Sequence, residues 1–198
     1  MAKHVAVLMG GWSAEREVSL ASGKPCAEAL EAKGYRVTRI DVGRDIATVL
    51  QTLKPDVALN LLHGHPGEDG TLQGILEIVG VPYTHSGVLA SAMAMQKDLA
   101  KSVLKAAGVP VPGGLIAARQ EAAKRHLIET PYVIKPIAEG SSVGVFIVKE
   151  DHQYPPQELT RDDWEFGDVL LAEDTTGQGH ISRAVAGKPR KSLFITLD

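Results

Sequence analysis

This sequence of 198 residues contains very little cysteine and asparagine, and its positive charges do not outnumber its negative ones. Cys26 is the only cysteine, which excludes an intramolecular disulfide and is typical of a reducing compartment. Lys and Arg total 21 against 24 Asp and Glu, and the formal net charge of −3 comes with no basic stripe. This balance argues against nucleic acid and anionic membrane as partners. Asn60 is the only asparagine.

Long apolar runs are also missing. The N-terminal run at residues 5–9 is too short for a signal peptide, and no cleavage pattern follows it. The longest uncharged stretch, residues 78–96, contains Pro82 and several polar residues, which a membrane span would not tolerate. We therefore expect a cytoplasmic protein without membrane contact. At 44% hydrophobic residues, the chain can bury a core in one or two domains.

In the first half of the chain, short apolar runs alternate with helical periodicity. Residues 5–8, 36–40 and 57–62 are typical of buried parallel strands. A helix should follow the first strand, with Ser13 as its N-cap and a kink at Pro25. Another helix is indicated by apolar residues spaced i, i+3, i+4, i+7, and it should end at a glycine; these residues are Leu72, Ile75, Leu76, Val79 and Gly80.

The polar loop at residues 63–70 should lie between the carboxyl end of a buried strand and a helix N-terminus, where open α/β sheets bind ligands. Its two histidines lack a nearby third metal ligand, so a hydrogen-bonding role for His63 near a substrate is favoured. Glu68 and Asp69 are assigned a structural role, because carboxylates at a helix start satisfy free N–H groups. The glycines after the first strand lack the third glycine of a dinucleotide site.

In the second half, residues 132–149 predict two strands joined by a mobile turn. The turn, Glu139-Gly140-Ser141-Ser142, offers N–H groups and hydroxyls to an anion, and Lys135 lies nearby. A lysine beside such a turn suits the phosphates of ATP; the alternative is an ordinary hairpin with a solvated lysine. Two X-Pro pairs at residues 109–112 exclude a helix there.

Four segments of the sequence are distinctive when taken together: residues 7–19 (VLMGGWSAEREVS), 63–74 (HGHPGEDGTLQG), 81–92 with Lys97, and 133–144 (VIKPIAEGSSVG). In this order they resemble the signatures of D-alanine–D-alanine ligases, which belong to the ATP-grasp superfamily. The likeness covers about residues 3–173. It implies an α/β chain with a parallel α/β domain of the Rossmann-like, pre-ATP-grasp type over residues 1–94, then an incomplete α+β ATP-grasp domain over residues 95–198.

The resemblance implies ATP-dependent ligation of two D-alanines through an acyl phosphate, for peptidoglycan precursor synthesis. Glu15 would hold the ammonium of the first D-alanine with Ser141 beside it, and His63 would lie near the acyl phosphate and the second substrate. A homodimer is compatible with the family. The implied nucleotide-binding residues, with the two lysines on the phosphates, are Lys97, Lys135, Glu139, Gly140, Ser142 and Glu173.

Beyond residue 173 the likeness ends, and residues 174–198 read as a divergent tail. The family holds Mg²⁺ or Mn²⁺ with carboxylates near an E-x-N motif in its last third, and a chain whose only asparagine is Asn60 has no such motif. We therefore expect a truncated or frameshifted chain, or a fragment, that lacks the metal ligands and is inactive alone. Two alternatives stay open: a ligase with another acceptor such as D-lactate, and a non-catalytic remnant that binds nucleotide or D-alanine weakly, or binds nothing.

Overall fold

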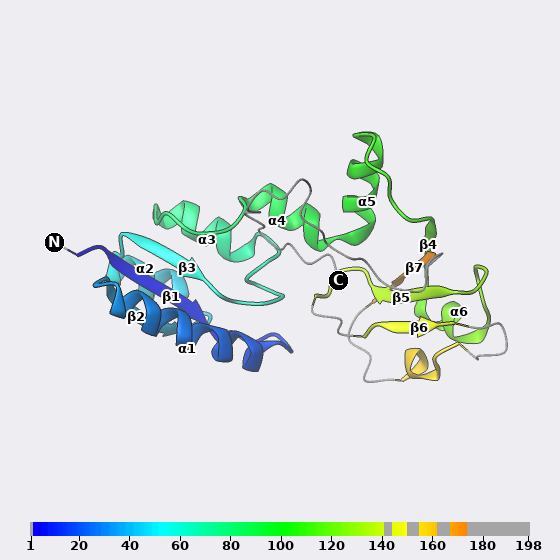
Figure 1. The fold of residues 1–198 in the computed structure, drawn as a ribbon, viewed down its shortest axis with the longest axis horizontal. Coiled ribbons are helices and arrows are strands. Elements are labelled where there is room, and N and C mark those ends of the chain that lie inside the picture. Colours follow the sequence, from blue (N-terminus) through cyan, green and yellow to red (C-terminus); the bar gives the residue numbers. More distant parts are fainter. Residues whose placement is uncertain (1, 141–143, 150–154, 162–166, 174–198) are drawn as a thin grey trace, which may run out of the picture. The chain divides into compact units, whose positions relative to one another are not determined.

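The computed structural model describes residues 2–140, 144–149, 155–161 and 167–173, and the statements below concern those residues. The chain forms two compact units, Met1–Met95 and Gln96–Asp198, which Figure 1 follows in sequence order. The first unit is a parallel α/β structure and the second contains an antiparallel sheet with helices, as the sequence predicts. None of the helices in the described ranges is long and apolar enough to cross a membrane.

The first unit is built on a parallel sheet in the order β2-β1-β3. Strand β1 lies in the middle because both of its faces can be buried. Ala6 and Leu8 pack with helices α2 and α3, whereas Val5 and Val7 pack with α1. The elements are β1 His4–Met9, α1 Arg16–Ala32, β2 Arg36–Asp41, α2 Ile46–Leu53, β3 Val57–Asn60, α3 Thr71–Val79 and α4 Val88–Met95.

Helix α1 differs from its prediction at its N-cap. Its N-cap is Glu15, whereas the hydroxyl of Ser13 accepts a hydrogen bond from the Glu15 N–H at 3.2 Å. Pro25 lies inside the helix and does not end it. The helix packs closely on β1, since a Cβ at Gly23 would lie 2.4 Å from Met9 Sδ. This packing offsets the hydrogen bond that Pro25 cannot donate. Cys26 lies half-buried in the same helix.

A polar cluster surrounds the buried His4 at the amino-terminal edge of this sheet. His4, only 4% exposed, has Nε2 2.8 Å from Thr38 Oγ1, while its Nδ1 meets the guanidinium of Arg36. Its backbone N–H donates to Asp56 Oδ2 at 2.6 Å. Burial lowers the pKa of His4 below its ordinary value of 6.5, Arg36 lowers it further, and Asp56 opposes the shift. These contacts therefore favour the neutral form of the imidazole in the folded chain.

The second unit contains an antiparallel sheet in the order β4-β7-β5-β6. The predicted strand pair at residues 132–149 is confirmed as β5 and β6, with Tyr132 opposite Val148. Tyr132, Ile134 and Leu171 form the core of this sheet together with helix α6. The elements are α5 Lys97–Ala106, β4 Gly114–Ala117, α6 Arg119–Lys124, β5 Tyr132–Pro136, β6 Phe146–Val148, the 3-10 helix η1 Gln157–Thr160 and β7 Val169–Glu173.

Candidate functional site

Two loops meet at the carboxyl edge of the first unit's sheet, one following β1 and one following β3. Two serines of the first loop and of α1 join them. Ser13 Oγ donates to the carbonyl of His63 at 2.8 Å. Ser19 Oγ donates to the carbonyl of Leu61 at 2.6 Å and accepts from the N–H of Gly10 at 2.9 Å. These bonds fix α1 against the exit of β3, and with it the side chain of Glu15.

Glu15 is the most unusual side chain at this edge. It is only 3% exposed, yet neither carboxylate oxygen has a hydrogen-bond partner among the described residues. Burying a carboxylate without a partner is costly, so native structures normally supply a cation or several donors. Gly64 lies directly against it, because a Cβ at that position would be 2.7 Å from Glu15 Oε2. The geometry suits a small cationic group that donates hydrogen bonds.

His63 comes from the loop after β3 and faces the same side of α1. Its Nε2 lies 3.5 Å from Ser22 Oγ, at the outer limit of hydrogen-bond distance. The Ser22 hydroxyl donates to the Val18 carbonyl at 2.5 Å. Glu15, Ser19 and Ser22 are spaced i, i+4 and i+7, so they lie on one face of α1, and this face is turned toward the ends of the strands.

Two side-chain amides that the sequence analysis missed hold the loop at residues 63–70 by hydrogen bonds. Asn60 Nδ2 and Gln73 Nε2 both donate to the carbonyl of Gly67, at 2.8 and 2.7 Å. Asn60 Oδ1 also accepts from the Leu62 N–H at 3.1 Å. Both amide side chains are fully buried. An amide inside an otherwise apolar strand was the available signal, because such a group is costly unless it is hydrogen-bonded.

The predicted role at the helix start is confirmed for Asp69, whereas Glu68 accepts a hydrogen bond within the loop instead. Glu68 Oε2 accepts from the N–H of Gly64 at 2.7 Å, and Asp69 Oδ1 accepts from the N–H of Thr71 at the start of α3 at 3.0 Å. Asp69 also pairs with His65 Nδ1 at 2.6 Å. Burial raises the pKa of Asp69, but the hydrogen bonds from His65 and Thr71 outweigh it and leave the pKa lowered. Both carboxylates are therefore occupied in shaping the loop.

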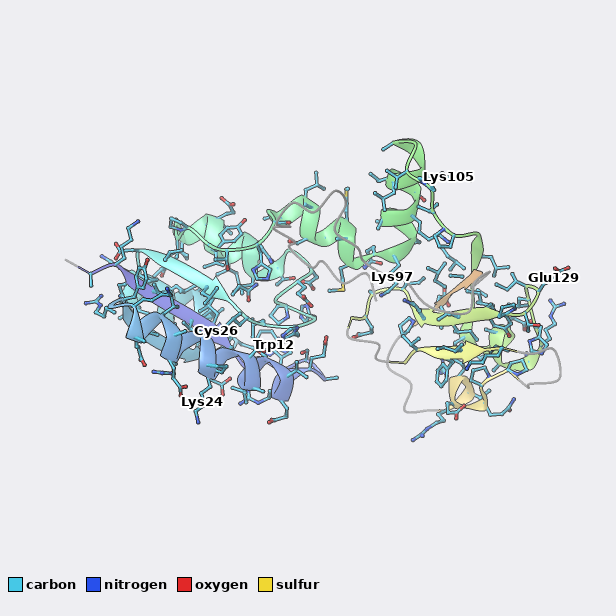
Figure 2. The ribbon with its side chains drawn as sticks, viewed as in Figure 1. Trp12, Lys24, Cys26, Lys97, Lys105 and Glu129 are labelled. Carbon is cyan, nitrogen blue, oxygen red and sulfur yellow. The ribbon has the colours of Figure 1, made fainter. Side chains whose placement is uncertain are left out.

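The rim of the same edge carries Trp12, labelled in Figure 2. The guanidinium carbon of Arg44 lies 4.8 Å from the centre of the Trp12 ring, and the ring of His65 meets it edge-on at 6.0 Å. Each contact is worth about 1 kcal/mol at an exposed site, so together they steady the two loop tips.

In the second unit, Lys97 and Lys135 line one cavity of about 280 Å³. Lys97 begins α5 (Figure 2) and is only 8% exposed. Its Nζ donates to the carbonyl of Ile137 at 3.4 Å and to that of Glu139. The loop that starts at Glu139 and Gly140 is thus hydrogen-bonded to Lys97, which the family resemblance assigns to the same nucleotide site. The apolar side of the cavity is formed by Leu104, Pro110, Val111, Leu170 and Ala172.

Several predicted residues fall partly or wholly outside this description. Ser141 and Ser142 lie outside the described residues. Glu173 ends β7, where it pairs with Tyr132 in the sheet, and its side chain lies outside the description. Within the described ranges, no three His, Cys, Asp or Glu side chains gather as a metal site. The described residues therefore offer no ligand set that fits Mg²⁺ or Mn²⁺, and we assign no reaction step to a metal held by them.

Comparisons with known proteins agree with the resemblance. The family model described as the D-ala D-ala ligase N-terminus matches residues 45–86. A D-alanine–D-alanine ligase from Rhodopseudomonas palustris is 65% identical over 194 residues, which cover 98% of this chain and 63% of that protein. The D-alanine–D-alanine ligase of Afipia carboxidovorans is 71% identical over 183 residues, covering 92% of this chain and 59% of that protein.

A solved structure adds the same result for the fold. The D-alanine–D-alanine ligase from Bacillus anthracis complexed with ATP superposes with a TM-score of 0.68 at 31% identity, covering 87% of this chain and 58% of that one. The chain thus spans about three fifths of the length of the curated relatives it matches. Over the part that it spans, the chain is similar in sequence and in fold to D-alanine–D-alanine ligases.

Proposed function

We propose that this chain supplies the first-substrate and phosphate-binding parts of an ATP-dependent ligase that joins two D-alanines for peptidoglycan synthesis. In that reaction the carboxylate of one D-alanine takes the γ-phosphoryl group of ATP, and the amine of a second displaces phosphate from the acyl phosphate. The buried, unpartnered carboxylate of Glu15 carries the proposal.

Glu15 has the charge and burial that an ammonium ligand needs. An α-ammonium offers three N–H donors, and each charge-assisted bond to a carboxylate is worth about 1.5–3 kcal/mol. Gly64, which has no side chain, lets the loop after β3 lie directly against the Glu15 carboxylate. His63 would stabilise negative charge on the acyl phosphate and on the oxyanion that forms when the second amine attacks its carbonyl carbon.

Lys97 and Lys135 would bind ATP phosphates. Ammonium groups are compact positive charges suited to phosphate oxygens, and the apolar wall of their shared cavity suits an aromatic base. We assign Glu139, Gly140, Ser141, Ser142 and Glu173 to the same nucleotide site on the family likeness. Phosphoryl transfer depends mainly on positioning and charge stabilisation, which these groups provide. The ATP complex of the Bacillus anthracis relative supports the nucleotide.

Two finer points belong to the same proposal. ATP-dependent transfer of this type uses Mg²⁺ to neutralise the phosphates, although we assign none of the described residues to hold the ion. Peptidoglycan precursors and ATP are both made in the cytoplasm, which is where we place the protein.

The proposal is tested on the purified chain with D-alanine and ATP, titrated separately by calorimetry. Binding of D-alanine that disappears in Glu15→Gln, while ATP binding is retained, supports it. A chain that binds neither ligand overturns it and indicates a non-catalytic remnant. Dipeptide formed from ATP, Mg²⁺ and D-alanine, measured by chromatography, tests turnover separately.

A further inference from the structure

Two serine hydroxyls flank Glu15 in sequence, Ser13 two residues before it and Ser19 four residues after it. They donate to the carbonyls of His63 and Leu61, at 2.8 and 2.6 Å. Carbonyls two residues apart in an extended segment point the same way. The two serines therefore join the start of α1 to one side of the chain leaving β3. Since Ser13 Oγ also accepts from the Glu15 N–H, the backbone of Glu15 belongs to the same network.

This arrangement fixes the two halves of the proposed D-alanine site relative to each other. Glu15 comes from α1, while His63 and Gly64 come from the loop after β3. The carboxylate itself has no hydrogen bond to hold it among the described residues, so its position depends on the backbone that carries it. Ser19, fully buried, also accepts from the Gly10 N–H at the end of β1.

We infer that Ser13 and Ser19 are positioning residues for D-alanine recognition, which set the distance between Glu15 and Gly64 without touching the ligand themselves. The inference rests on the proposed function for the ligand, but the geometry it claims exists in the free chain. Preorganised sites lose affinity steeply when a binding group shifts by a fraction of an ångström.

The first test needs no ligand. Amide hydrogen exchange is followed by NMR in Ser13→Ala and Ser19→Ala. We expect about tenfold faster exchange at Gly64 in both variants, because its N–H, which donates to Glu68, shares a peptide group with the His63 carbonyl that accepts from Ser13. The Val49 amide of α2, which donates to the Asp45 carbonyl, should exchange at the wild-type rate. Unchanged exchange at Gly64 would overturn the inference.

The second test adds D-alanine. Each serine variant should bind D-alanine about tenfold more weakly than wild type and bind ATP equally well, since the two hydrogen bonds of the hydroxyl that hold the backbone around Glu15 are lost. Ser13→Thr, which keeps the hydroxyl at a half-buried position, should restore affinity. If Ser19→Ala does not fold, the comparison of Ser13→Ala with Ser13→Thr still tests the inference. The matched control is Thr52→Ala, which removes a hydroxyl bonded only to the Thr48 carbonyl within α2.

The two proposals fail in different ways. If Glu15→Gln abolishes D-alanine binding but both serine variants bind like wild type, the serines only stabilise the fold and the inference is wrong. If wild type binds no D-alanine, the proposed function is wrong, and the exchange at Gly64 alone decides whether the serines position Glu15.

Discussion

Replacing Gly64 by alanine should separate ligand binding from stability. The backbone φ of Gly64 is +64°, which costs a residue with a Cβ about 1 kcal/mol. The new Cβ would also lie 2.7 Å from Glu15 Oε2, whereas ordinary contact begins near 3.4 Å. The carboxylate oxygen therefore has to move by about 0.7 Å, the difference between these distances. Glu15 can move only as the end of its side chain, so the clash alters its position more than it destabilises the fold.

Gly80→Ala is the matched control for this substitution. Gly80 has a φ of +71° and nothing within 4 Å of an added Cβ, so it bears the same backbone strain without the clash. Both variants should lose about 1 kcal/mol of unfolding free energy in urea titrations. Only Gly64→Ala should weaken D-alanine binding, by about tenfold to a hundredfold in calorimetry. Equal D-alanine affinity in the two variants would refute the reasoning.

Three further predictions concern other parts of the chain. Because the pKa of His4 is lowered in the folded state by burial and by Arg36, the unfolded chain takes up the proton first, and stability should fall as the pH drops below about 6.5; His4→Gln should flatten this slope in urea titrations at pH 5 to 8. Asn60→Ala should cost about 1–3 kcal/mol of unfolding free energy by the same method, because the Leu62 N–H loses its buried acceptor, and a loss below about 0.5 kcal/mol would contradict this. Lys135→Met should weaken ATP binding at least about tenfold, whereas Lys105→Met, outside the shared cavity, should leave it unchanged.

Local sequence patterns predict most of the regular elements. The spacing of Leu72, Ile75, Leu76 and Val79 gives α3, and Gly80 ends it with a positive φ as expected. Helix α2, missing from the prediction, has the same spacing in Ile46, Val49, Leu50 and Leu53. It was therefore within reach of the sequence.

The sequence-based predictions are wrong or incomplete where the role of a side chain depends on a partner far away in the sequence. Ser13 looks like an N-cap from its neighbours alone, but its hydroxyl donates to His63, 50 residues away. In the sequence, Asn60 is a polar interruption of an apolar run, and only the structure shows that its amide donates to the Gly67 carbonyl. The sequence names Glu15 through the family likeness, whereas only the packing of Gly64 and α1 reveals that its carboxylate is buried with no hydrogen-bond partner in the described part of the chain.

The central claim is that Glu15 binds the ammonium of D-alanine, and the most direct test compares D-alanine with D-lactate. The two ligands differ only in carrying an ammonium or a hydroxyl on the same carbon. Wild type should prefer D-alanine by at least about tenfold in calorimetry, as one charge-assisted hydrogen bond implies. In Glu15→Gln this preference should vanish. A preference that survives the substitution would contradict the account, because some other group would then be recognising the ammonium.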